Sequence, residues 1–224
     1  MINFYVVATP IGNYEDISQR ALRVLQEADF VVCESENEYK KLFGILKLEE
    51  KKYFLCNEHD ENEAIELAIP LLEKGEKGVL ISDCGTPLFE DPGHKLLSEI
   101  IKKGFSVSSV PGANALMTAL SLSPFKITHF YYAGRISPRN YERKNELINL
   151  LKRDEAVIII ETPYRMENII SLFREINAKR RVFIAYNLTM EDEELIWGYP
   201  DEVEKAIKSK NITKGEFILI IDQL

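Results

Sequence analysis

One pattern constrains the fold of this chain more than any other: a short apolar run, a loop rich in glycine and proline, and then a helical pattern. Its clearest instance is Val79–Gly93, where the apolar residues Val79–Ile81 stop at Ser82 and two glycines, two prolines and three carboxylates follow. Open α/β sheets present small-molecule sites in such loops, at the carboxyl ends of their strands. A plain strand-to-helix connection fits this single stretch equally well, because turn residues gather in all loops.

The same pattern occurs twice more in the first half of the chain. The apolar run Phe4–Ala8 leads into Thr9–Asn13, and Phe105–Val110 leads into Pro111–Ala115. With the shorter units between them, five strand–helix units follow one another, which predicts a parallel sheet with helices on both faces. Because the carboxyl ends of parallel strands meet at one edge, we expect the three loops to line one cleft. Glu90–Pro92 is predicted to begin the next helix.

The second half of the chain has a different pattern. Its apolar runs Val182–Leu188 and Glu194–Trp197 lie as close together as the strands of a hairpin, whereas Ala156–Ile160 and Phe217–Ile221 are separated by helical segments. This predicts a mixed sheet with helices. The fold class is therefore α/β, with two α/β domains at residues 1–122 and 123–224.

Composition limits the setting in which the chain works. Its 36 acidic and 28 basic residues give a formal charge of −8, which disfavours non-specific binding to nucleic acid. No apolar run approaches the roughly 20 residues of a membrane span, and the first residues lack the basic segment of a signal peptide. Three widely spaced cysteines fit a reducing compartment. We expect a cytoplasmic protein without membrane contact.

The loops contain neither of the common nucleotide-binding motifs. A phosphate-binding loop with its lysine is absent, and so is a GxGxxG pattern, which argues against hydrolysis of nucleoside triphosphates. The chain has three histidines and no HExxH motif, so we expect no metal site. A nucleoside-like ligand held mainly by backbone groups fits the loops best.

Several polar residues have both a structural and a functional interpretation. Asp83 and Glu161 each follow an apolar run, where a carboxylate either accepts hydrogen bonds from a ligand or caps the next turn. His59 lies among carboxylates, as either a solvated loop residue or a catalytic group. A cluster of basic residues lies near three tyrosines and consists of Arg135, Arg139, Arg143 and Lys144. Basic and aromatic residues together suit contact with phosphates and stacking on bases, but they are equally compatible with a solvated helix face.

The order and spacing of the loops resemble the tetrapyrrole methylase superfamily. The segments that carry the resemblance are VVATPIGNYEDISQRALRVLQEAD, SDCGTPLFEDPG and PGANAL, followed by ETPYR and KGEF. Within that superfamily the chain is most similar to the branch that methylates a cytidine ribose of small-subunit ribosomal RNA. The resemblance covers nearly the whole chain.

The resemblance implies a class III methyltransferase: two α/β domains that bind S-adenosylmethionine in the cleft between them, in a homodimer. In the second domain, Leu188 and Gly215 match positions at which members of the family also contact the cofactor. In the first domain the resemblance assigns the cofactor to loops that contain Pro10, Gly12, Asp83, Gly85, Thr86, Pro87, Pro111 and Gly112.

The implied reaction is transfer of a methyl group to a ribose 2′-hydroxyl of ribosomal RNA in the small subunit. Alignment of donor and acceptor supplies much of the rate of such a displacement, and a modest general base completes it. The candidates for that base are Glu34, His59 and Glu161. Arg135 and Arg139 are the candidates for phosphate contact.

Four departures from the branch's motifs keep other functions open. Ser35 and Asn37 replace an aspartate and an arginine, while Asn187 and Met190 replace a glutamate and a lysine. These changes leave two alternatives: a methyltransferase for a tetrapyrrole or other small molecule, and an S-adenosylmethionine-binding protein without catalytic activity.

Overall fold

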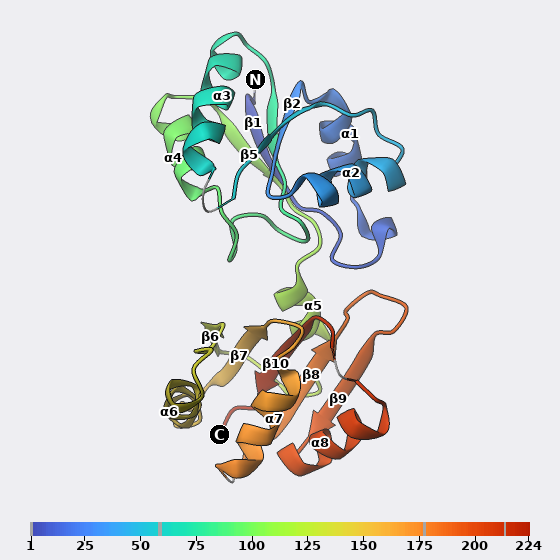
Figure 1. Ribbon diagram of the computed structural model, residues 1–224, viewed down its shortest axis with the longest axis vertical. Coiled ribbons are helices and arrows are strands. Elements are labelled where there is room, and N and C mark those ends of the chain that lie inside the picture. The colour runs from blue at the N-terminus through green and yellow to red at the C-terminus, as the bar shows by residue number, and fades with distance from the viewer. Residues whose placement is uncertain (1, 58–59, 177, 213) are drawn as a thin grey trace. The chain divides into compact units, whose positions relative to one another are not determined.

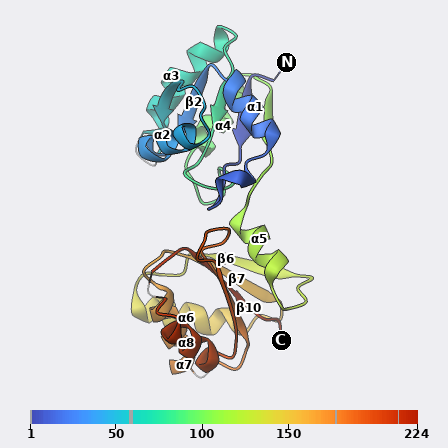
Figure 2. The same ribbon diagram turned by 90° about the vertical axis from the view of Figure 1, so that its right-hand side faces the viewer.

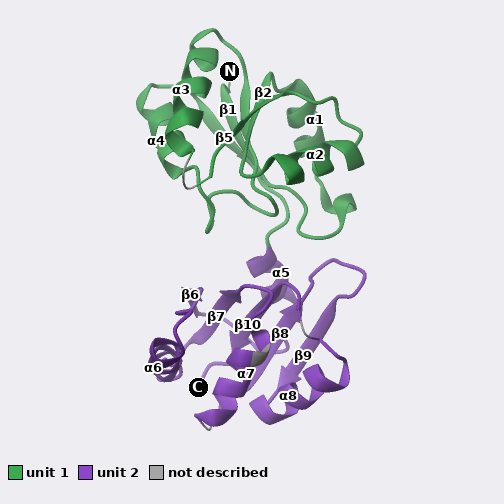
Figure 3. Ribbon diagram, viewed as in Figure 1, with its two compact units in different colours: residues 1–114 green, residues 115–224 purple. Residues whose placement is uncertain are grey.

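A computed structural model describes residues 2–57, 60–176, 178–212 and 214–224. The chain forms two compact units, residues 1–114 and 115–224 (Figure 3). The sequence places the boundary after residue 122 instead. The difference is helix α5 (Ala115–Leu122), which packs against strand β10 of the second unit. None of the described helices has the length and apolar character needed to cross a membrane.

The first unit is built on a five-stranded sheet in the order β3-β2-β4-β1-β5. Every neighbouring pair is parallel, with Phe4 of β1 opposite Gly78 of β4 on one side and Val107 of β5 on the other. This confirms the parallel sheet predicted from the repeated units. The strands are β1 (Phe4–Val7), β2 (Phe30–Cys33), β3 (Lys52–Leu55), β4 (Gly78–Leu80) and β5 (Val107–Val110).

Helices cover both faces of this sheet (Figure 1). On one face α1 and α2 pack on Val7, Val31 and Val79, and on the other α3 and α4 pack on Phe4 and Leu80. Alternate residues of each strand therefore enter separate cores, which is why the strands are apolar throughout. The helical segments are η1 (Tyr14–Asp16), α1 (Gln19–Glu27), α2 (Glu36–Ile45), α3 (Glu61–Glu73) and α4 (His94–Lys102).

Helix α4 begins later than the sequence predicts. Leu88 and Glu90 have φ values of 71° and 70°, so the backbone is not helical there, and the predicted helix start at Glu90–Pro92 is wrong. Gly93, at φ 113°, directly precedes the helix. The Glu61 carboxylate of α3 accepts hydrogen bonds from the Gly93 and Lys95 N–H groups at 3.1 and 2.7 Å. A side chain from another helix thus caps α4.

The second unit is built on a mixed sheet in the order β6-β7-β10-β8-β9, as predicted. Among the described strands of this sheet, only β6 and β7 pair in parallel, and the other pairs are antiparallel. Helices α6, α7 and α8 share the main core with one face, and α5 lies on the opposite face (Figure 2). The strands are β6 (Phe130–Gly134), β7 (Ala156–Glu161), β8 (Val182–Tyr186), β9 (Glu194–Gly198) and β10 (Phe217–Ile221), and the helices are α6 (Asn140–Leu150), α7 (Met166–Glu175) and α8 (Pro200–Ser209).

Candidate functional site

Three loops of the first unit lie together because they follow the adjacent strands β4, β1 and β5. We call Thr9–Asn13, Ser82–Pro87 and Pro111–Asn114 the triple loop. The Thr9 and Gly85 backbones exchange two hydrogen bonds, of 2.8 and 3.1 Å. The Thr86 hydroxyl donates to the Ala113 carbonyl at 3.1 Å. The prediction that the loops open at one sheet edge is confirmed, and they also bind one another directly.

A side chain would be crowded at two glycine positions of the triple loop. Gly85 has a φ of 76°, in the left-handed region, and a Cβ there would lie 3.2 Å from Ile11 Cγ2. A Cβ on Gly112 would lie 3.0 Å from the Ala8 Cβ. Of the residues assigned to the cofactor in this unit, the buried ones are Pro10, Gly85 and Pro87, the half-buried ones Gly12 and Thr86, and the exposed ones Asp83, Pro111 and Gly112.

A carboxylate links the triple loop to the neighbouring strand β2. Asp83 Oδ1 accepts a hydrogen bond from the Ser35 N–H at 3.1 Å, and the Ser35 hydroxyl caps α2 by accepting from the Glu38 N–H at 3.3 Å. Glu34 precedes Ser35 and is half-buried. Glu34 and Asp83 thus follow adjacent strand ends. His59, another candidate base, lies outside the described residues.

Four loops of the second unit also gather at one sheet edge. Phe217, the first residue of β10, lies opposite both Glu161 at the end of β7 and Tyr186 at the end of β8. The Gly215 N–H donates to the Pro163 carbonyl at 3.3 Å. Asn187 Oδ1 accepts from the Glu216 N–H at 2.9 Å, and Leu188 beside it is buried. The loop after β6 lies at this edge too, because β6 is parallel to β7.

Glu161 is occupied by structural partners. Its side chain is 0% exposed and forms an ion pair with Arg165 at 2.9 Å. Its carboxylate also accepts hydrogen bonds from the Ile136 and Thr162 N–H groups, both at 3.2 Å. Desolvation raises the pKa of Glu161, against the opposing effects of Arg165 and these hydrogen bonds. This geometry favours a role in holding the loop after β6 over a role as general base.

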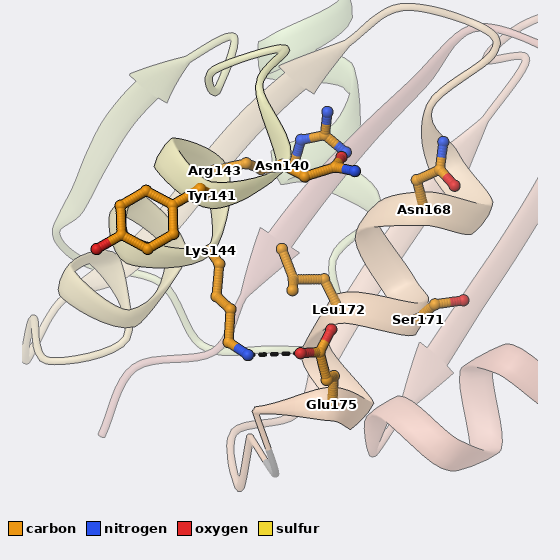
Figure 4. Close-up of a pocket in the computed structure, with 8 residues that line it drawn as sticks. All are labelled: Asn140, Tyr141, Arg143, Lys144, Asn168, Ser171, Leu172 and Glu175. Carbon is orange, nitrogen blue, oxygen red and sulfur yellow. Dashed lines mark hydrogen bonds and ion pairs between the residues drawn. The ribbon is translucent and has the colours of Figure 1, made fainter.

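Most of the basic cluster is engaged within the protein. Arg139 pairs with Glu142 at 2.6 Å, and Arg143 is buried where its guanidinium donates to the Ser137 and Pro138 carbonyls. Lys144 pairs with Glu175 across a pocket of about 330 Å³ between α6 and α7 (Figure 4). Arg135 is exposed and forms no hydrogen bond or ion pair with the described part of the chain.

Comparison with known proteins shows the family. The family described as Tetrapyrrole (Corrin/Porphyrin) Methylases matches residues 3–202. The chain belongs to the tetrapyrrole methylase family. This methylase is therefore a methyltransferase, which confirms the enzyme class and the family expected from its motifs.

The curated relatives of this methylase match along most of their length. A ribosomal RNA small subunit methyltransferase I of Borrelia garinii subsp. bavariensis is 31% identical over 220 residues, covering 98% of both chains. The protein of the same name from Bacillus subtilis is 34% identical, covering 97% of this chain and 74% of the relative.

Solved structures confirm the fold of the methylase. A cobalt precorrin-4 methyltransferase has a TM-score of 0.69 at 15% identity, and the match covers 98% of this chain and 94% of that one. A uroporphyrin-III-C-methyltransferase from Thermus thermophilus has a TM-score of 0.65 at 16% identity, covering 99% and 94%. Both confirm the predicted architecture of two α/β domains.

Sequence reasoning missed the residues that hold the loops of the methylase in place. Hydrogen bonds join Arg165 to Ile136 and Asn187 to Glu216, and each pair is distant in the chain. Ser35 donates its N–H to Asp83 and caps helix α2. The sequence carries no helical i,i+4 signal for the Glu161–Arg165 ion pair, because Glu161 ends β7 and Arg165 precedes α7. No group of histidine, cysteine and carboxylate side chains suited to a metal ion occurs within the described ranges.

Proposed function

We propose that this methylase binds S-adenosylmethionine at the triple loop and transfers its methyl group to a ribose 2′-hydroxyl of small-subunit ribosomal RNA. The observation that carries the proposal is the match to the Borrelia protein, which covers 98% of both chains and whose name states a ribosomal RNA substrate. A ribosomal substrate would place the protein in the cytoplasm. The family resemblance adds a homodimer, which light scattering of the purified protein tests.

The triple loop suits a nucleoside-like methyl donor. It offers the Asp83 carboxylate and the exposed backbone of Pro111 and Gly112, and it carries no side-chain cation that would select a phosphate. Pro10, Gly85 and Pro87, which the resemblance also assigns to the cofactor, are buried and shape this surface. We assign Leu188 and Gly215 to the same cofactor by the family resemblance. When bound, S-adenosylmethionine supplies a methyl group on a positively charged sulfur.

Glu34 is the general base in this proposal. Its carboxylate would accept the proton that the ribose hydroxyl loses when the methyl group of the donor is transferred to the hydroxyl oxygen. Glu34 is half-buried and directly precedes Ser35, whose N–H donates to Asp83 of the triple loop, whereas Glu161 is fully buried in its ion pair. Glu34→Gln should lower kcat by about 10²- to 10⁴-fold without changing donor affinity. Glu36→Gln is the control, because Glu36 is the first residue of helix α2 and forms an exposed ion pair with Lys40. Equal losses in both variants would refute the assignment.

The acceptor side is assigned to Arg135 and Arg139. Arg135 is exposed and forms no hydrogen bond or ion pair with the described residues, so its guanidinium is available for a phosphate. Arg139 would exchange its ion pair with Glu142 for a phosphate contact. An exposed ion pair is worth about 1 kcal/mol or less, so this exchange is inexpensive.

A matched pair of glycine variants tests the donor site. Gly85→Ala places a side chain at φ 76° and 3.2 Å from Ile11, whereas Gly75→Ala, at φ 88°, meets nothing within 4 Å. Both variants carry a similar backbone strain of about 1–2 kcal/mol. Only Gly85→Ala displaces the triple loop, so calorimetry should show roughly tenfold weaker binding of S-adenosylmethionine in that variant alone. Equal affinities would show that the donor binds elsewhere.

The acceptor is tested with labelled S-adenosylmethionine and small ribosomal subunits that lack their native methyl groups. Label in the RNA ribose supports the proposal. Label in a porphyrinoid but not in RNA would identify a tetrapyrrole methylase. Donor binding without turnover on either acceptor would identify a protein that has lost catalysis.

A further inference from the structure

Two side chains at the loop edge of the second unit have no role in the reaction described above. Tyr164 lies between β7 and α7, and 69% of its surface is exposed. The Lys214 Nζ lies 4.7 Å from the centroid of the Tyr164 ring. Their hydrogen bond raises the pKa of Lys214, so the ammonium group is charged at neutral pH. The exposed Tyr164 ring therefore lies beside the positively charged Lys214.

The backbone that carries these two side chains is tied to the buried core. Gly215, next to Lys214, donates its N–H to the carbonyl of Pro163, next to Tyr164. The hydroxyl of buried Tyr186 donates to the Lys214 carbonyl at 2.7 Å. The ring and the ammonium group are therefore presented from a fixed support, which reduces the entropy lost when a ligand binds.

Arg135 belongs to the same surface. Arg165 donates from its Nη2 to the Ile136 and Ser137 carbonyls at 2.8 and 2.7 Å, which ties the loop of Arg135 to the loop of Tyr164. The charge of Arg135 also acts on the Glu216 carboxyl, where it opposes the rise in pKa caused by desolvation. Arg135 thus lies near the segment of Lys214. We call Tyr164, Lys214 and Arg135 the aromatic pad.

The chemistry of the aromatic pad matches single-stranded nucleic acid. Such strands are bound by aromatic rings that stack on bases and by cations that track the phosphates. A single exposed aromatic residue needs no explanation by itself. Here, however, one cation lies beside the ring and a second lies on a loop tied to the same sheet edge, in a chain whose formal charge is −8. This edge also carries Leu188 and Gly215.

We propose that the aromatic pad holds the single-stranded RNA next to the methylated ribose, with Tyr164 stacked on a nucleobase and with Lys214 and Arg135 on phosphates. This inference rests on the proposed function and names the residues that select an RNA acceptor.

The stacking contact is tested by substitutions of Tyr164. Tyr164→Ala should raise KM for undermethylated small subunits by roughly 5- to 150-fold, the range measured for loss of one base-stacking contact, with unchanged affinity for S-adenosylmethionine. Tyr164→Phe keeps the ring and should stay within about threefold of the wild type. The control is Tyr199→Ala, which is also exposed but follows β9 at the opposite sheet edge.

The phosphate contacts are tested by the salt dependence of RNA binding. Lys214→Ala and Arg135→Ala should each reduce the slope of log K against log salt by about 0.7, whereas Tyr164→Ala and the control Lys205→Ala should leave it unchanged. Unchanged KM and slopes, in a wild type that labels RNA, would overturn the aromatic pad and leave the proposed function intact. A wild type that labels no RNA would overturn both.

Discussion

The buried ion pair between Glu161 and Arg165 gives the sharpest test of how the second unit is held together. Glu161→Ala removes the carboxylate that pairs with Arg165 and accepts two backbone hydrogen bonds, from Ile136 and Thr162. Arg165 is left with 17% of its side chain exposed, and its Nε already lacks a partner in the described structure. The variant therefore leaves the largely buried Arg165 guanidinium without a carboxylate partner.

The cost follows from what remains around Arg165. Removal of one partner from a buried ion pair costs about 3–5 kcal/mol. Arg165 keeps the carbonyls of Ile136 and Ser137 as acceptors, which offsets part of that loss. We therefore expect the lower end of the range, about 3 kcal/mol in the free energy of unfolding. The loop that carries Arg135 should loosen at the same time.

Urea unfolding followed by tryptophan fluorescence measures this cost. The chain has one tryptophan, Trp197 in β9, so the signal reports on the second unit. Glu175→Ala is the control, because it removes an ion pair to Lys144 whose side chains are 61% and 40% exposed. That pair is worth about 1 kcal/mol or less. If Glu161→Ala costs no more than Glu175→Ala, the buried pair does not hold the second unit together.

Two further predictions concern the cysteines and a glycine. Burial is the main cause that raises the pKa of the Cys33 and Cys56 thiols to about 12, so at pH 8 only about one of these thiols in 10⁴ is ionised. Exposed Cys84 should therefore be the one thiol that reacts quickly with a disulfide reagent in the native protein. All three thiols should react in denaturant. S-adenosylmethionine should slow the reaction of Cys84, whereas two fast thiols in the native protein would contradict the burial. Gly215→Ala puts a Cβ into the ring of Tyr186 and should destabilise the second unit by about 1–3 kcal/mol, whereas Gly44→Ala, in helix α2 with open space, should stabilise by up to about 1 kcal/mol. Thermal unfolding measures both changes, and equal effects would refute the role of Gly215.

The strands and the loop edge of the first unit follow from the sequence because each depends on local pattern. Apolar runs that are buried on both faces identify β1 and β4, and parallel pairing then brings their loops together. The start of α4 does not follow from the sequence. It depends on the carboxylate of Glu61 from another helix and on left-handed backbone at Leu88, and neither leaves a local signal.

The role of Glu161 is equally invisible in the sequence. A carboxylate directly after a strand is as compatible with catalysis as with structure. What distinguishes the two is the backbone of Ile136, which is 25 residues away in the chain and donates to the carboxylate. The exposure of Tyr164, three residues later, has the same non-local origin, because Gly215 supports its loop.

The structure also separates the four departures from the family motifs into two kinds. Ser35 replaces an aspartate and still caps a helix, since serine and aspartate are both good N-cap residues. Asn187 replaces a glutamate at φ 43°, which asparagine adopts readily. Its amide accepts from Glu216 and donates to Asp192 at 2.8 Å, and a carboxylate has no hydrogen for that second bond. These two substitutions therefore preserve the scaffold.

The other two departures change the surface. By the family resemblance, Asn37 and Met190 stand where the related branch carries an arginine and a lysine, and both are exposed in this chain. An RNA strand still requires positive charge, because phosphate contacts dominate affinity for nucleic acids. Arg139 and Lys144 are held in ion pairs, whereas Arg135 and Lys214 of the aromatic pad form no ion pair with a described carboxylate, so these two cations can meet that requirement. The differences at Asn37 and Met190 thus make the aromatic pad more important to an RNA acceptor in this chain.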